Sequence, residues 1–179
     1  SKLMAERGLC SRREADRLIE KGMVLVDDQV VDRLGSRFDP TVCIALAPEI
    51  QRERLRLVTV LLNKPPGVVS NQPEKGYPEA ASLITRGNLQ NLAGQTPREP
   101  PSVRTLHVAG RLDIDSSGLL VLTQNGQVAR QLISPNSVIE KEYVVRLTER
   151  VPTAALVRMR GELTLDGRLL KPAQITQTD

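Results

Sequence analysis

The stretch Gly110–Thr123, GRLDIDSSGLLVLT, decides how this sequence folds. From Leu119 onward it is an apolar run of the kind that forms a buried strand, and a second apolar run, Leu106–Ala109, precedes it. The segment between the two runs holds two glycines, an arginine and two carboxylates. We therefore expect Asp113 and Asp115 to lie on a loop between two strands, where a rigid support can aim a catalytic side chain.

The two carboxylates leave alternatives open. We expect one working carboxylate and one structural carboxylate rather than a paired acid and base. A hydrolase that uses both Asp113 and Asp115 is a weaker alternative, and an acidic surface turn without chemistry is the plainest explanation of this spacing alone.

Outward from this loop, the pattern predicts an α+β region over residues 58–179. A strand is expected over 58–62 and a break at Asn63–Gly67, which contains Lys64. The other expected elements are a short helix over 79–84, helices over 127–133 and from Pro152, a strand over 143–147, and a hairpin that turns at Asp166-Gly167.

The N-terminal part, residues 1–46, reads as a separate small module of helices and strands. Ser11 and Glu14 form a capping box at the start of a helix that Gly22 closes. A tight hairpin with Asp27-Asp28 at its turn follows. The polar, charged segment 47–57 is expected to link this module to the region that begins at residue 58.

Composition narrows the class of protein. The 179 residues carry a net charge of +4, and the pI of about 9.4 favours a polyanionic partner. Aromatic residues make up only 2%, which argues against a platform of stacked rings for single strands. There is no run of eighteen apolar residues, no signal-like N-terminus and no metal-ligand set around the two cysteines, so we expect a cytoplasmic protein without a metal.

Basic residues gather early in the N-terminal module and can present one face to phosphates. A solvated helix face is the alternative. The residues are Lys2, Arg7, Arg12, Arg13, Arg17 and Lys21.

Four segments resemble, in the same order, the RsuA/RluB/RluE/RluF family of ribosomal RNA pseudouridine synthases. Within that family, their sequences are most similar to the F-type large-subunit enzymes. They are the N-terminal pattern 3–31, LNKPPGVVS (62–70), GRLDIDSSGLLVLT (110–123) and EKEYVV (140–145). The resemblance implies a small S-four-like RNA-binding module of the αL type over 1–46. A synthase domain with a mostly antiparallel mixed sheet would follow over 58–179.

The resemblance also implies roles for single residues. Asp113 would be the catalytic aspartate, and Tyr143 the ring that stacks on the target uracil and helps to move the proton. Arg111 and Leu112 would shape the loop around Asp113, and Lys64 would lie in a turn near the substrate. In the N-terminal module, Arg12, Arg13, Arg17 and Lys2 would face RNA phosphates.

The chemistry that the resemblance implies is an isomerisation, which needs no cofactor because nothing is oxidised and no group is transferred. An aspartate is ionised at neutral pH and can act as nucleophile or base at the sugar. The target uridine must leave its stack, at a cost of a few kcal/mol, and a stacked ring can return about 1–3 kcal/mol.

The expected substrate is structured RNA, most of all large-subunit ribosomal RNA, with tRNA as a further candidate, and the expected enzyme is a monomer. The family's domain continues past Asp179 with a basic motif that supplies an arginine to the aspartate, so we expect the chain to be truncated. A non-catalytic RNA-binding or ribosome-assembly protein is the main alternative.

Overall fold

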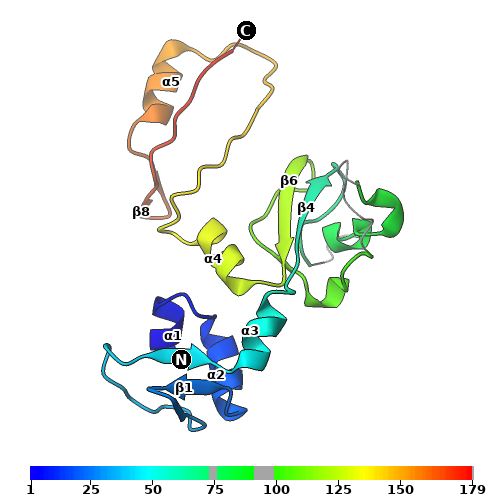
Figure 1. The fold of residues 1–179 in the computed structure, drawn as a ribbon. Coiled ribbons are helices and arrows are strands. Elements are labelled where there is room, and N and C mark those ends of the chain that lie inside the picture. Colours follow the sequence, from blue (N-terminus) through cyan, green and yellow to red (C-terminus); the bar gives the residue numbers. More distant parts are fainter. Residues whose placement is uncertain (73–75, 91–98, 179) are drawn as a thin grey trace. The chain divides into compact units, whose positions relative to one another are not determined.

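The computed structural model describes residues 1–72, 76–90 and 99–178, and its contacts divide the chain into two compact units, Ser1–Glu140 and Lys141–Asp179 (Figure 1). The domain boundaries at residues 46 and 58 stay a prediction. Among the described residues, none of the helices combines the length and the apolar character that crossing a bilayer demands.

The first unit begins with a small α+β module. Helices α1 (Lys2–Glu6) and α2 (Arg12–Glu20) precede a three-stranded antiparallel sheet in the order β2-β1-β3, with β1 at Val24–Val26, β2 at Gln29–Val30 and β3 at Ile44–Leu46. Strand β3, which the sequence does not predict, pairs with β1 over three residues. The module is compact because one face of α2 packs against this sheet.

The predicted local signals of this module are present. Ser11 Oγ accepts a hydrogen bond from the Glu14 amide at 3.2 Å, and the Ser11 amide donates to the Glu14 carboxylate at 3.4 Å. Asp27 and Asp28 have φ values of 47° and 63°, the backbone of a tight hairpin turn. The buried core contains Met4, Cys10, Ala15, Leu18, Ile19, Val24 and Leu46.

The segment predicted as a linker contains helix α3 (Pro48–Arg54), in which none of the side chains is buried. Pro48 occupies the first turn, Glu49 lies near the N-terminus, and Arg52 and Arg54 lie near the C-terminus. These positions suit proline and the helix dipole, and half-buried Ile50 packs against the core of the N-terminal module.

A second antiparallel sheet, in the order β4-β6-β5, follows in the first unit. Strands β4 (Thr59–Lys64) and β6 (Gly118–Thr123) pair over six residues, from Thr59↔Thr123 to Lys64↔Gly118, and β5 (His107–Val108) pairs with the end of β6. The predicted strands and their antiparallel arrangement are confirmed. The sheet covers a core that includes Val68, Ala80, Ile84, Leu106, Leu120 and Leu122.

Short elements complete the first unit. The helix predicted over 79–84 is a single 3₁₀ turn, η1 (Ala80–Leu83), and two further 3₁₀ turns are η2 (Arg86–Asn88) and η3 (Val103–Thr105). After β6, helix α4 (Gly126–Ile133) begins at Asn125, whose side chain accepts from the Gln127 amide at 2.9 Å.

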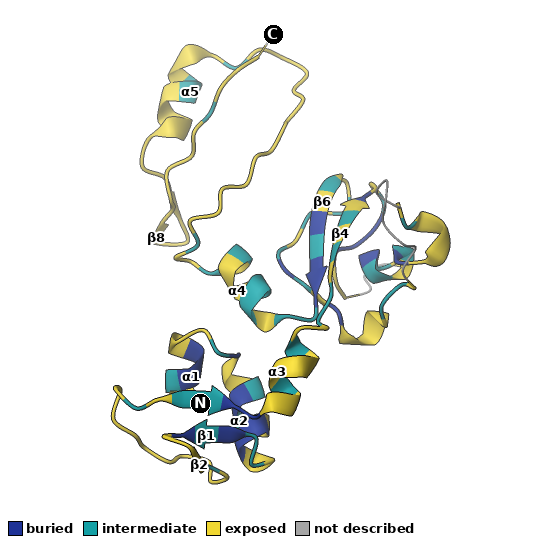
Figure 2. Ribbon diagram, viewed as in Figure 1, coloured by how far each residue is buried: buried dark blue, intermediate teal, exposed yellow. Residues whose placement is uncertain are grey.

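The second unit contains α5 (Thr153–Arg160) and the hairpin β7 (Thr164–Leu165) with β8 (Arg168–Leu169), and the predicted turn at Asp166-Gly167 joins the two strands. Its described residues, 141–178, are exposed or half-buried, as Figure 2 shows by its almost uniform yellow. Helix α5 forms as predicted, and none of its side chains is buried.

The strand predicted over 143–147 is wrong. These residues have no regular structure, and Val144 is 95% exposed. An apolar, β-branched run favours an extended backbone, but a strand also requires a partner for its hydrogen bonds. No partner strand for this segment occurs among the described residues.

Candidate active site

Asp113 lies on the predicted loop between β5 and β6, with its side chain exposed. Its carbonyl oxygen accepts a hydrogen bond from the Ser116 amide at 3.1 Å, which closes a tight turn. Leu112 and Ile114, on either side, are half-buried, whereas Asp115 is exposed like Asp113. The loop therefore turns its apolar side chains toward the protein and leaves the carboxylates toward solvent.

The turn after β4 holds the C-terminal side of Asp113. The Lys64 side chain is fully buried, and its ammonium donates to the carbonyls of Pro65 at 2.9 Å, Val68 at 2.8 Å and Ile114 at 3.3 Å. The Gly67 amide also donates to Ile114 O, at 2.8 Å. A lysine that is surrounded by carbonyls in this way fixes the backbone on which the Asp113 loop rests.

This geometry changes what Lys64 can do. The resemblance implies that Lys64 lies in a turn near the substrate, structural more than catalytic, and also counts it among the substrate-binding residues. Its ammonium lies out of reach of solvent, and its three donors are already used. A direct contact with RNA would require these hydrogen bonds to break. The structure supports a role for Lys64 in holding the loop.

Ser70 holds the N-terminal side of Asp113. Its hydroxyl donates to Leu112 O at 2.6 Å and accepts from the Leu112 amide at 2.8 Å. Sequence reasoning gave Ser70 no role. It stands in the segment 62–70, but its partner lies 42 residues away, and nothing local links the two.

The other residues predicted around Asp113 differ from one another in their exposure and in the unit to which they belong. Arg111, at the start of the loop, is exposed, and Leu112 is half-buried with its backbone bound to Ser70. Tyr143 is 65% exposed and belongs to the second unit, whereas Asp113 belongs to the first. The approach of Tyr143 to Asp113 stays a prediction.

The predicted phosphate-binding residues Lys2, Arg12, Arg13 and Arg17 are all exposed. Lys2 forms a solvent-exposed ion pair with Glu6 at 3.7 Å. Arg7, in contrast, has a structural role, because its guanidinium donates to the carbonyls of Val42, at 2.6 Å, and Pro40.

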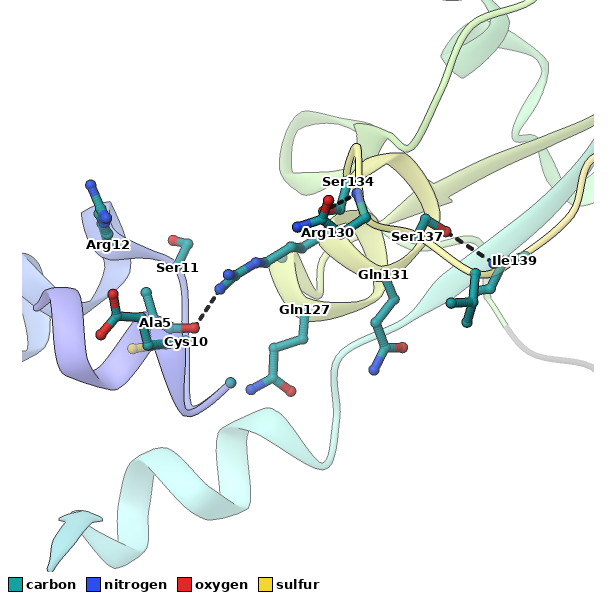
Figure 3. Close-up of a pocket in the computed structure, with 15 residues that line it drawn as sticks. Ala5, Cys10, Ser11, Arg12, Gln127, Arg130, Gln131, Ser134, Ser137 and Ile139 are labelled. Atoms are coloured by element: carbon teal, nitrogen blue, oxygen red, sulfur yellow. Dashed lines mark hydrogen bonds between the residues drawn. The ribbon is translucent and has the colours of Figure 1, made fainter. Parts of the chain in front are cut away.

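Arg12 also lines a cavity of about 760 Å³ in the first unit, shown in Figure 3. Polar side chains of α4 line it as well, among them Gln127, Gln131 and Arg130, which donates to the carbonyl of Ala5. The cavity thus offers cationic and amide donors, the groups that contact a nucleic-acid backbone.

Cys10 at the edge of this cavity is not a nucleophile. Burial, reinforced by the nearby Glu14 carboxylate, raises the pKa of its thiol to about 11, so it stays protonated at neutral pH. Within residues 1–72, 76–90 and 99–178, no group of three or more histidine, cysteine or acidic side chains is arranged to hold a metal ion.

Comparison with known proteins identifies both parts of the chain. The family profile of RNA pseudouridylate synthases matches residues 58–174, and that of the S4 domain matches residues 1–41. The chain is 32% identical over 174 residues to the ribosomal large subunit pseudouridine synthase B of Bacillus subtilis, covering 97% of the chain and 65% of that relative. It is 30% identical over 177 residues to the dual-specificity RNA pseudouridine synthase RluF of Escherichia coli, covering 98% of the chain and 55% of that relative.

A solved structure described as a pseudouridylate synthase superposes with a TM-score of 0.56 at 25% identity, over 99% of this chain and 71% of that one. The chain thus spans about 55–65% of the length of the two curated relatives named here. The α+β fold and the family inferred from the four sequence segments are confirmed, with F-type and B-type relatives at similar identities. This chain belongs to the RNA pseudouridylate synthase family and carries an S4 domain at its N-terminus.

Proposed function

We propose that the protein isomerises a specific uridine to pseudouridine in structured RNA, with Asp113 as the catalytic residue. The observation that carries this proposal is the construction of the Asp113 loop. Hydrogen bonds from Ser70 and Lys64 hold the backbone on both sides of the aspartate, and its carboxylate remains exposed. A reactive group needs this combination of a fixed backbone and an open side chain.

The proposed reaction breaks the C–N glycosidic bond of the uridine, rotates the freed base and forms a C–C bond to the same sugar. The proton that leaves the new bonding carbon is balanced by the one that the base nitrogen gains, so reactant and product are isomers. The ionised carboxylate of Asp113 acts at the sugar as nucleophile or base. Tyr143 stacks on the flipped uracil and helps to move the proton.

The proposed substrate is large-subunit ribosomal RNA. The name of the Bacillus subtilis relative, a ribosomal large subunit synthase, supports this substrate. The dual specificity in the name of the Escherichia coli relative supports a second RNA class as a further substrate, for which tRNA is the candidate. We propose that the enzyme acts as a monomer in the cytoplasm, where ribosomal RNA is modified. Arg12, Arg13, Arg17 and Lys2 contact phosphates from the S4 domain, and Arg111 and Leu112 shape the catalytic loop.

Release of tritium from RNA labelled at C5 of uridine tests the reaction in the full-length protein. We expect Asp113→Ala to lower the rate on the order of 10⁴-fold or more, because the group that acts at the reacting atoms is lost. Asp115→Ala is the matched control and should release tritium at nearly the wild-type rate. Equal release by Asp113→Ala and wild type contradicts the assignment, and wild-type RNA binding without release would identify a non-catalytic RNA-binding protein.

A salt series tests the RNA-binding surface separately. Arg12→Ala should weaken RNA binding and reduce the slope of log K against log salt by about 1, since one phosphate contact is lost. Arg86→Ala removes the same charge from the synthase region, where Arg86 pairs with Glu99 at 3.4 Å, and serves as the control. Identical slopes for the two variants would remove Arg12 from the RNA interface.

A further inference from the structure

We propose that Ser70 is a positioning residue for Asp113, an inference that rests on the proposed function. Its hydroxyl makes a reciprocal pair of hydrogen bonds with the backbone of Leu112, the residue directly before the aspartate. This pair sets the direction in which the Asp113 side chain leaves the backbone, so its loss should slow the reaction without weakening RNA binding.

The support behind Ser70 is rigid. The preceding residue, Val69, forms a parallel bridge with Glu79: its amide donates to Pro78 O at 3.0 Å, and its carbonyl accepts from the Ala80 amide at 2.8 Å. Ala80 is fully buried. The Ser70 hydroxyl therefore projects from a backbone that is anchored at the preceding residue, Val69.

The pair of bonds uses both functions of one hydroxyl group. The Ser70 O–H donates to Leu112 O at 2.6 Å, and an oxygen lone pair accepts from the Leu112 N–H at 2.8 Å. Ser70 is only 5% exposed, so water cannot easily replace it. Removal of the hydroxyl leaves an amide and a carbonyl of Leu112 without partners, and the loop must shift to satisfy them.

The role of Ser70 can be separated from that of Lys64. Lys64 binds Pro65 and Val68 as well as Ile114, so its removal disturbs the whole turn after β4. The hydrogen bonds of the Ser70 side chain, in contrast, both go to Leu112. A substitution at Ser70 thus changes the position of the catalytic loop with less effect on the sheet.

The test compares Ser70→Ala with Ser70→Thr in the full-length protein. Single-turnover tritium release gives the rate of the chemical step, and filter binding gives the Kd for RNA. We expect Ser70→Ala to lower the rate constant about 10–100-fold, as a small misplacement of a reacting group does, with Kd unchanged. Ser70→Thr keeps the hydroxyl and should recover most of the rate.

Ser36→Ala is the matched control, because Ser36 Oγ also donates to a backbone carbonyl, that of Arg33 at 2.8 Å, in the N-terminal module. It should retain the wild-type rate. Amide hydrogen exchange supplies a readout that does not depend on activity: Ser70→Ala should expose the Leu112 amide while the amides of Leu120 and Leu122 stay protected. If Ser70→Ala does not fold, Ser70→Cys replaces it, since a thiol is a weak donor, and the same loss of rate is expected.

Three results would each overturn the positioning role: an unchanged rate for the alanine variant, a higher Kd for RNA without a slower rate, or a threonine variant no faster than the alanine variant. Unchanged exchange at Leu112 in an active enzyme overturns it as well and leaves the proposed function standing. A wild-type protein that releases no tritium overturns the proposed function itself, and with it the kinetic role of Ser70.

Discussion

The sheet β4-β6-β5 buries the apolar side chains of one face against a core, whereas no described side chain of the second unit, Lys141–Asp179, is buried. In the sheet, Leu120 is 2% exposed and Leu122 is fully buried. In the second unit, Val144 is 95% exposed and Leu165 is 60% exposed. The support of Asp113 is therefore built from contacts within the first unit, whereas the described contacts of the second unit provide no comparable support for Tyr143.

This difference matters because the proposed reaction needs both side chains. An aspartate on a loop held by buried hydrogen bonds has its direction fixed before RNA binds. A tyrosine on an irregular, exposed segment acquires a fixed direction only when something packs against that segment, and it loses conformational entropy on doing so. The two predicted catalytic residues should thus respond very differently to substitution and to solvent.

Hydrogen exchange should show the largest contrast. We expect the amides of Leu120 and Leu122 to exchange only through extensive opening. The free energy of that opening should approach the free energy of unfolding of a whole domain, about 5–15 kcal/mol. The amides of Val144 and Val145, outside any strand, should exchange at nearly the rate of an unfolded chain. Mass spectrometry of peptides from these two regions measures both, and protection of the second equal to that of the first would contradict the contrast.

Truncation of buried and exposed leucines should show the next largest effect. Leu122→Ala removes a side chain from the core and should lower the free energy of unfolding by about 2–5 kcal/mol. Leu165→Ala, at an exposed position of β7, should change it by less than about 0.5 kcal/mol. Urea unfolding followed by circular dichroism compares the two, and an equal loss would show that Leu165 packs against something in solution.

The buried lysine gives a third test. Lys64→Met keeps most of the side-chain volume but leaves the carbonyls of Pro65 and Val68 without this donor. The free energy of unfolding should therefore fall by about 2–3 kcal/mol. Lys2→Met removes the same charge at an exposed site and should be nearly neutral. If Lys64→Met is equally neutral in urea unfolding, the ammonium does not hold the turn.

Local signals in the sequence predicted much of this structure. The capping box at Ser11 and Glu14 begins α2 as expected, and the apolar runs before and after Asp113 form paired strands. Such features depend on residues that are close in sequence or on strong apolar patterns. They place the Asp113 loop correctly without any knowledge of its surroundings.

Features that depend on distant partners were not predictable in the same way. The run at 143–147 has the composition of a strand, but composition does not supply a partner for pairing. Strand β3 exists because β1 pairs with it, and the hydrogen bonds from Ser70 to Leu112 join residues 42 positions apart. Helix α3 is the exception, since its proline and charge positions are local signals, although the polar composition of the segment indicates a linker.

Tyr143 provides the smallest and most specific test of the contrast. Because Tyr143 is 65% exposed, Tyr143→Ala should leave the free energy of unfolding unchanged. It should weaken binding of RNA that contains the target uridine by about 1–2 kcal/mol, toward the lower end of what one base stacked on a ring contributes. Filter binding with target RNA, and with RNA in which the target uridine is replaced by cytidine, isolates the contribution of the flipped base.

Tyr77→Ala is the control, because Tyr77 is the only other tyrosine and is 41% exposed. It should bind both RNAs as the wild type does. Tyr143→Phe keeps the ring and should retain the affinity while it loses any part of the rate that depends on the phenol proton. An equal loss of affinity for the target RNA and for the cytidine-substituted RNA would mean that Tyr143 contacts RNA without recognising the flipped base. A lower free energy of unfolding for Tyr143→Ala would mean that the second unit packs around this ring in solution.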